Sequence, residues 1–327
     1  MKYRLLGKTG FNVSEVSLGT WQVGGKWGAD FSHSNADEIL NKAVDKGINF
    51  IDTADVYGDG HSEKAVGRLV RSRKEQIYVA TKCGRKLNPH KAEAYTTKAI
   101  RGFVEDSLKN MNLETIDLIQ LHCPPSDVFY QPEFFELFDR LKDEGKIQFL
   151  GVSIEKVEEG LKAMQYSNVC SIQLIYNMFR QRPNELLFKE AQKNNIGLIA
   201  RVPLASGLLT GKFDKQSTFT KDDHRNFNRN GEAFDKGETF SGIDYEKGLA
   251  AVEELKKLFP NASLPLLALR WILHFEEISC VIPGASDVKQ LEDNVNAVDY
   301  ATLNHSQIAD IEKIYTKYIK PDVHQRW

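Results

Sequence analysis

Hydrophobic residues recur along the chain in two alternating patterns, one typical of strands and the other of helices. Short apolar runs rich in Val and Ile indicate buried parallel strands, because such strands are covered on both faces. Stretches in which apolar residues return every three or four positions indicate amphipathic helices. The predicted strand and helix pairs are 16–19 with 35–46, 50–52 with 62–70, 77–82 with 96–111, 116–122 with 133–144, 149–153 with 155–165, 171–174 with 184–194, 197–201 with 245–258 and 264–275, and 279–282 with 288–298.

Eight strand–helix units in 327 residues predict an α/β fold, a (β/α)8 TIM barrel that forms a single domain over 1–327. An open doubly wound sheet is the main alternative, but a dinucleotide enzyme of that kind carries G-x-G-x-x-G after its first strand. Gly58 and Gly60 begin a similar run that lacks the third glycine. The barrel is therefore the preferred fold.

Three further segments complete the predicted architecture. Residues 3–16, with a turn at 7–10, predict an N-terminal β-hairpin, and an amphipathic helix is expected at about 306–318. Residues 212–242 form a long polar loop after the seventh strand. Loops of this length inside a compact domain usually serve a function or are mobile. We expect a lid over the barrel mouth, with a disordered surface insertion as the alternative.

Composition narrows the possible partners. The chain is 41% hydrophobic and has a net charge of −2, so no basic field favours nucleic acid or anionic lipid. No apolar run is long enough to span a membrane. The four cysteines are widely spaced and form no CxxC pair, which argues against a disulfide framework or a metal site. We expect a cytoplasmic protein that acts on a small molecule.

Polar side chains follow several of the predicted strands where each strand ends. In a parallel barrel these ends meet at one mouth, where active sites form. The polar residues at or just after the strand ends are Asp52, Tyr57, Lys82, His122, Ser153, Gln173 and Arg201. Any one of them alone is more often a hydrogen-bonded core residue or one partner of a solvated ion pair than a catalytic residue. Several titratable groups converging on one mouth from strands two, three and four indicate a catalytic site.

The types of these residues suit one kind of chemistry. Tyrosine, with a pKa near 10, is a poor acid at neutral pH. The ammonium of Lys82 would lower the pKa of Tyr57, and the buried carboxylate of Asp52 would hold that ammonium in place. A neutral His122 could orient a substrate oxygen. The set suits proton delivery to a carbonyl oxygen while a hydride reaches its carbon; acyl transfer lacks a Ser or Cys beside a base.

These motifs together resemble the aldo-keto reductase superfamily. The matching segments run in order from residue 3 to about 298: Leu6 to Gly10, Leu18 to Trp21, Asp52-Thr53-Ala54 with Tyr57-Gly58, Ala80-Thr81-Lys82, Leu121 to Pro124, Gly151-Val152-Ser153, and Ile282 to Ser286. The resemblance implies a barrel that binds a nicotinamide cofactor, usually NADP(H), without a Rossmann domain. It also implies reduction of aldehydes or ketones, or the reverse oxidation of an alcohol or sugar.

The resemblance further implies a role for each residue. Tyr57 would be the general acid, Lys82 and Asp52 would tune it, and His122 would orient the carbonyl. Trp21 would wall the substrate pocket beside Tyr57 and His122. Arg201 stands where better-known members stack a Tyr on the nicotinamide ring, and a guanidinium plane can also stack. The implied cofactor contacts are Gly19, Thr20, Trp21, Ser153, Gln173, Arg201, Pro203, Leu204, Ser206, Gly207, Leu209, Lys212, Gly284, Ala285, Ser286, Gln290, Asp293 and Asn294.

Two departures from the family pattern affect the cofactor. Ile154 replaces the Asn that many members place after the Ser of the fifth strand. Ser286 and Gln290 stand where members that prefer NADP often have Arg or Lys, although Lys212 or Arg225 could supply charge. NADP remains the expected cofactor, with NAD possible.

Substrate specificity depends on the least predictable parts of the chain. Substrate choice is expected to depend on Trp21, Trp27, residues 124–130 and the insertion at 212–242. The alternative function is a cofactor-sensing regulatory subunit of the same fold with little turnover.

Overall fold

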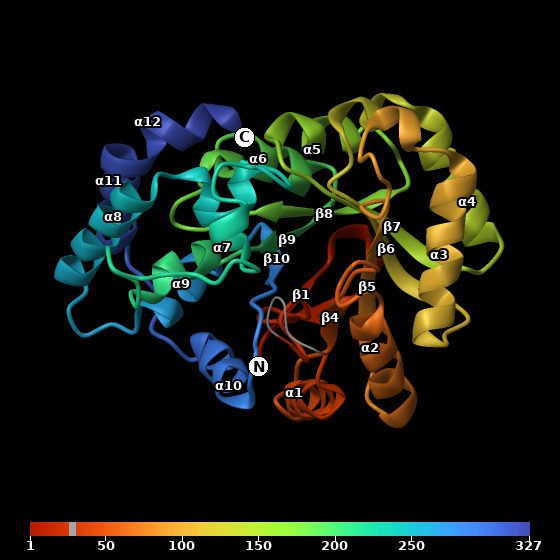
Figure 1. The fold of residues 1–327 in the computed structure, drawn as a ribbon, viewed down its shortest axis with the longest axis horizontal. Helices are drawn as coiled ribbons and strands as arrows, with labels where there is room; N and C mark the ends of the chain where they lie inside the picture. The colour runs from red at the N-terminus through yellow and green to blue at the C-terminus, as the bar shows by residue number, and fades with distance from the viewer. Residues whose placement is uncertain (26–30) are drawn as a thin grey trace.

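The computed structural model describes residues 1–25 and 31–327 and shows eight parallel strands with helices around them (Figure 1). Neighbouring strands pair in chain order from β3 to β10. Their bounds are β3 (Leu18–Gly19), β4 (Phe50–Asp52), β5 (Tyr78–Cys83), β6 (Ile116–His122), β7 (Ile147–Ser153), β8 (Val169–Ile175), β9 (Gly197–Arg201) and β10 (Ile278–Val281). The predicted (β/α)8 barrel is confirmed.

The barrel closes where its first and last strands meet. The amide of Ser17 donates to the carbonyl of Val281 at 2.9 Å, and the amide of Gly19 donates to the carbonyl of Pro283 at 3.1 Å. A Cβ on Gly19 would lie 2.8 Å from the carbonyl oxygen of Ile282, closer than real Cβ contacts. Glycine is therefore required at the end of β3, because a side chain would push the closing strands apart.

Helices follow the strands as the hydrophobic periodicity predicts, mostly within two or three residues. α1 begins at His33 because Ser32 caps it by accepting a hydrogen bond from the amide of Asn35. The helix predicted at 155–165 is shorter, since Glu155 lies before the helix and accepts a hydrogen bond from Arg201 instead. The helices are α1 (His33–Asp45), α2 (His61–Ser72), α3 (Thr97–Met111), α4 (Pro132–Asp143), α5 (Val157–Ala163), α6 (Leu187–Lys193), α7 (His224–Phe227), α8 (Tyr245–Leu258), α9 (Leu264–Ile272), α10 (Val288–Val295), α11 (His305–Ile314) and α12 (Lys320–Val323).

The N-terminal hairpin closes the bottom of the barrel. Its strands are β1 (Tyr3–Leu5) and β2 (Asn12–Ser14), which confirms the predicted hairpin. Leu6, Phe11 and Val13 belong to a buried cluster with residues from five barrel strands. The bottom of the barrel is therefore a packed apolar core, and the cavity described below lies at the opposite end.

The barrel interior changes from apolar to polar along each strand. Successive side chains of a strand point to opposite faces, so every second residue points into the barrel. Phe50 on β4 and Ala80 on β5 belong to the apolar cluster, and two residues later come Asp52 and Lys82. The same step leads from Ile199 to Arg201 on β9. Strand parity therefore places these polar groups together at the mouth.

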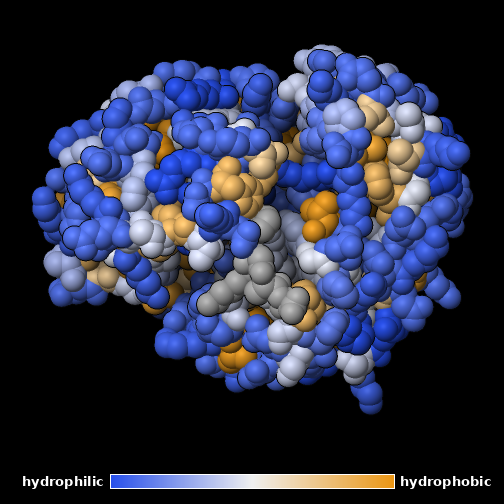
Figure 2. Space-filling view, in the orientation of Figure 1, coloured by the Kyte–Doolittle hydropathy of each residue, from blue (hydrophilic) through white to orange (hydrophobic). Residues whose placement is uncertain are grey.

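The insertion at 212–242 has a defined course in the structure. It contains α7 and two short 3-10 turns, at Lys236–Glu238 and Phe240–Gly242. Its residues Phe213, His224 and Glu238 help to line the mouth cavity. The face in Figure 2 is mainly hydrophilic and is hollowed near its centre. Within the described ranges, no helix is long and apolar enough to cross a membrane.

Candidate active site

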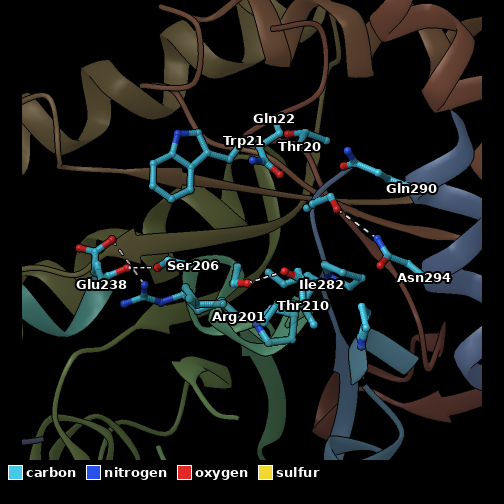
Figure 3. Close-up of a pocket in the computed structure, with 18 of the residues that line it drawn as sticks. Thr20, Trp21, Gln22, Arg201, Ser206, Thr210, Glu238, Ile282, Gln290 and Asn294 are labelled. Carbon is cyan, nitrogen blue, oxygen red and sulfur yellow. Dashed lines mark hydrogen bonds and ion pairs between the residues drawn. The ribbon is translucent and has the colours of Figure 1, made fainter. Parts of the chain in front are cut away.

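An elongated cavity of about 410 Å³ lies at the carboxyl ends of the strands. It runs from Tyr57 and His122 past Arg201 to Gln290 and Asn294 on α10. Figure 3 shows Trp21 and Arg201 on opposite sides of the cavity and α10 at the end away from Glu238. The site therefore spans the whole width of the mouth rather than one loop.

Lys82 lies at the centre of the predicted catalytic group. Its Nζ donates to Asp52 Oδ2 at 2.6 Å, to the carbonyl of Thr53 at 2.8 Å and to Tyr57 Oη at 3.4 Å. The side chains of Lys82 and Asp52 are 1% and 2% exposed. The register explains the meeting, because β4 and β5 are neighbours and both side chains point inward near the strand ends. The carboxylate at the end of β4 therefore has the partner that its burial requires.

Two glutamines complete the environment of Asp52. Its Oδ1 accepts hydrogen bonds from Gln173 Nε2 at 2.7 Å and from Gln120 Nε2 at 3.1 Å. A Cβ on Gly151 of β7 would clash with Ser171 Oγ and lie 3.2 Å from Gln120 Cγ, so this glycine leaves room for both side chains. Both carboxylate oxygens are thus bonded, which holds Asp52 as an anchor for the ammonium rather than as an acid.

The pKa of Tyr57 differs from the sequence-based expectation. Burial raises the pKa of Tyr57 above its ordinary value, although Lys82 lowers it in part. The lowering by the ammonium agrees with the expectation, but the expectation did not count the larger cost of forming a phenolate in the buried mouth of the barrel. Tyr57 therefore carries its proton at neutral pH. This is the form that a proton donor needs.

His122 lies beside this group at the end of β6. Its ring is 6.1 Å from that of Tyr57, centroid to centroid, at an interplanar angle of 84°. Burial, and then the charges of Arg85 and Lys82, hold the pKa of His122 well below its usual range. Its Nδ1 is buried without a hydrogen-bond partner among the described residues. The imidazole is therefore neutral in the cavity wall.

The structure brings most of the predicted cofactor residues to the lining of one cavity, and four of them do not line it. Those that line it are Gly19, Thr20, Trp21, Gln173, Arg201, Pro203, Leu204, Ser206, Gly207, Lys212, Gly284, Gln290, Asp293 and Asn294. Ser153, Leu209, Ala285 and Ser286 are not among the lining residues. Ser153 is fully buried, with its hydroxyl 3.3 Å from Cys123 Sγ. Gln173, expected at the nicotinamide, also donates to Asp52.

Arg201 has partners that the sequence did not indicate. Its Nη2 donates to Glu155 Oε1 at 2.7 Å, and its Nη1 lies 3.5 Å from Glu238 Oε2. Glu238 also accepts from Arg85 Nη2 at 2.6 Å. Figure 3 shows Arg201 and Ser206 both joined to Glu238 by dashed lines. The guanidinium is thus fixed between two carboxyl groups at the cavity wall.

Sequence reasoning missed several residues of this site. Gln120 could have been found, because it precedes His122 by two positions and shares its inward face. His224 and Glu238 come from the insertion, which has no periodicity that would predict their direction. The ring of Trp21 lies 6.1 Å from Tyr57 and 5.2 Å from His224. Trp27, expected to affect substrate choice, lies outside the described residues.

Comparison with known proteins agrees with this geometry. A sequence profile of the Aldo/keto reductase family matches residues 15–316. Aldo-keto reductase YhdN of Bacillus subtilis is 32% identical over 329 positions, which cover 99% of this chain and 96% of that protein. Glycerol dehydrogenase AKR11B4 of Gluconobacter oxydans superposes with a TM-score of 0.77 at 31% identity, over 97% of this chain and 96% of its own.

A second solved structure gives the same result. The holo form of aldo-keto reductase AKR11C1 of Bacillus halodurans has a TM-score of 0.77 at 28% identity, with 96% of both chains covered. The profile match and these relatives span nearly the whole chain, including every strand end that contributes to the cavity. The chain therefore belongs to the aldo-keto reductase family of NAD(P)H-dependent oxidoreductases.

Proposed function

We propose that this protein reduces a small aldehyde, ketone or sugar carbonyl with NADPH, and that Tyr57 is the general acid. The observation that carries the proposal is the position of Lys82 between Asp52 and Tyr57, with neutral His122 beside them. No nucleophilic Ser or Cys stands in this group, since Cys123 is buried and its pKa is raised above the usual range. The group is suited to moving a proton, not to forming a covalent intermediate.

The residues divide the work by their charge states. When bound, the nicotinamide supplies a hydride to the carbonyl carbon. His122, being neutral, can donate a hydrogen bond to the carbonyl oxygen and hold it near Tyr57. Tyr57 then gives its proton to that oxygen, and Lys82 stabilises the phenolate that remains. Trp21 covers one side of Tyr57 and limits the space next to the carbonyl.

The far half of the cavity fits a dinucleotide. In the turn Ala205–Thr210, Ser206 and Gly207 have φ of 55° and 97°, a left-handed bend at the cavity wall. Such bends form concave sites for anions. Gln290 and Asn294 on α10 line the other side of this half. The polar lining and the bend fit a pyrophosphate and a nucleoside better than a second carbonyl substrate.

The preference for NADPH depends on the insertion. Lys212 and Arg225 line the cavity, whereas Ser286 and Gln290 carry no charge. Arg225 lies beside the bend, because a Cβ on Gly207 would be 3.5 Å from Arg225 Nη1. Asp223 engages its Nε and Nη2, which leaves Nη1 as the edge nearest Gly207. Lys212 and Arg225 are therefore our proposed contacts for the extra phosphate of NADPH.

Oxidation of NADPH with a panel of aldehydes tests the function. Glyceraldehyde belongs in the panel because a protein of similar structure is a glycerol dehydrogenase. We expect Tyr57→Phe to lose at least about 100-fold in kcat, the scale of general acid catalysis, and to keep its affinity for NADPH. Equal kcat in the wild type and in Tyr57→Phe would show that Tyr57 is not the general acid. Tight binding with negligible turnover in the wild type would indicate the regulatory subunit.

Fluorescence titration tests the cofactor preference. We expect NADPH to bind more tightly than NADH, and Arg225→Gln to reduce that difference by about 10-fold, because one charged contact to a phosphate is lost. Arg229→Gln is the control, since Arg229 is in the same insertion but does not line the cavity. Equal affinities for NADPH and NADH in the wild type would show that the chain does not select the phosphate.

A further inference from the structure

Two carboxyl groups surround Arg201 at the cavity wall. Glu155 follows β7, and Glu238 comes from the insertion, so the pair joins two segments that are distant in sequence. Arg201 Nη2 lies 2.7 Å from Glu155, and its Nη1 lies 3.5 Å from Glu238. Side-chain exposures are 11% for Glu155 and 7% for Glu238. Both carboxyls therefore share one guanidinium in a nearly water-free environment.

The two carboxyls have unequal surroundings. Arg85 also binds Glu238 at 2.6 Å, so that, although burial opposes it, Arg85 and Arg201 hold the pKa of Glu238 below its usual range. Glu155 has no second cation at hydrogen-bond distance, and its Oε2 is buried without a partner among the described residues. Burial, with the charge of Glu238, raises the pKa of Glu155 to about 8.

The other charges that face Glu155 come from four segments. Arg201 on β9, Arg180 after β8 and Arg85 after β5 favour its ionised form. Glu238 and Asp235 of the insertion oppose it. Two carboxylates that share one site rarely ionise together, because the second charge repels the first. At neutral pH the pair around Arg201 therefore holds one proton, and Glu155 carries it.

This pair lies next to the place where a hydride must be transferred. A ring that passes hydride to a carbon held by Tyr57 and His122 must lie against the cavity wall nearby, which includes Gln173 and Arg201. The charge of Arg201 reaches both catalytic side chains, since it lowers the pKa of Tyr57 and of His122. The reduced nicotinamide ring is neutral and the oxidised ring carries one positive charge. The charge of the nicotinamide ring beside Arg201 therefore changes by one unit in each turnover.

We propose that Glu155 and Glu238 form a carboxyl pair whose proton content follows the oxidation state of the bound nicotinamide. The pair keeps one proton beside the neutral reduced ring and releases that proton to solvent beside the positive oxidised ring. No bond other than Glu155 O–H changes, and the released proton balances the new positive charge. This inference rests on the proposed function and adds a proton-linked site that the catalytic residues do not include.

Calorimetric titration in two buffers of different ionisation enthalpy counts the protons released on binding. At pH 7 we expect the wild type to release part of one proton when NADP⁺ binds and none when NADPH binds. Glu155→Gln should release none with either nucleotide. Glu158→Gln is the matched control, because Glu158 lies three residues away with 60% of its side chain exposed and pairs with Arg182. It should release protons as the wild type does.

A second measurement follows the affinities for the two nucleotides across pH. In the wild type, the affinity for NADP⁺ relative to NADPH should rise by about 10-fold between pH 6 and pH 9, because the ionised pair attracts the oxidised ring. The same ratio should be flat in Glu155→Gln. Equal proton release with both nucleotides, a ratio independent of pH, or unchanged release in Glu155→Gln would each overturn the inference. Failure of either nucleotide to bind would instead overturn the proposed function.

Discussion

Two groups of buried charges share the mouth of this barrel, and they are built in opposite ways. Asp52 and Lys82 stand on neighbouring strands, 30 residues apart in the chain, and every donor of the ammonium has a partner nearby. The group around Arg201 brings together four residues from four separate segments: Arg85, Glu155, Arg201 and Glu238. The first group needs only residues at the ends of β4 and β5 and in the segment that follows β4. The second requires the insertion to lie in place, so its charge can respond to changes at the mouth.

The largest effect should come from breaking the first group. Lys82→Met leaves the 2% exposed carboxylate of Asp52 without its cation. We expect the free energy of unfolding to fall by about 3–5 kcal/mol, the cost of an unpaired buried charge, and activity to be lost. Urea denaturation followed by circular dichroism measures the stability. Adding Asp52→Asn to Lys82→Met should recover part of the loss, and equal instability of both variants would argue against the ion pair.

The next effect concerns Asp55, close to the first group. Burial, with the charge of Glu63, raises the pKa of Asp55 to about 7, against about 3.9 in an unfolded chain. The folded state then binds more protons between these values, so this group lowers stability as pH rises from about 4 to 7. Asp55→Asn removes that loss, so the variant should gain on the wild type with rising pH, by up to about 4 kcal/mol at pH 8.

Denaturation of the two proteins at pH 5 and pH 8 measures this gain. A constant difference between them would show that Asp55 stays ionised across the range. Asp59→Asn is the control, since Asp59 is 96% exposed in its side chain and should give no pH-dependent difference.

A smaller effect is expected in the second group. Arg85→Gln removes the shortest ion pair of Glu238, at 2.6 Å. We expect a loss of about 1–2 kcal/mol, because a charged hydrogen bond is lost but Glu238 keeps Arg201. Trypsin should also cleave within 212–242 several-fold faster. Lys86→Gln is the control, because Lys86 is the neighbouring cation and its 3.8 Å ion pair with Asp59 is exposed. Wild-type cleavage in Arg85→Gln would show that Glu238 does not hold the insertion.

The smallest effect should come from a pair on the outer side of the insertion. Lys215 and Glu246 lie 3.4 Å apart with about 74% and 71% of their side chains exposed. Exposed pairs of this kind contribute little, since water screens them. Lys215→Gln should leave the thermal midpoint unchanged at 0.15 M salt. A clear shift of the thermal midpoint would mean that the exposure of an ion pair does not decide how much it contributes to stability.

Several features could be predicted because they follow from local periodicity. The strands, the helices and the hairpin agree closely with the hydrophobic pattern. The meeting of the candidate catalytic residues could be predicted because Asp52, Lys82 and His122 lie at the ends of successive strands, whose register is set by the parallel barrel. The pKa of Tyr57 could not, because burial outweighs the ammonium and burial depends on the whole mouth.

The sequence by itself determined the family, the barrel and the residues beside Lys82, since strand parity and chain order dictate which side chains meet. Only the tertiary structure decided that Arg201 is held by Glu155 and Glu238, and that Ser153 is fully buried and does not line the cavity. An irregular insertion has no repeat that fixes the direction of its side chains, so its contacts depend on the folded surface beneath it. The physical reason is that burial and charge pairing across distant segments exist only once the chain has folded and brought these segments together at the barrel mouth.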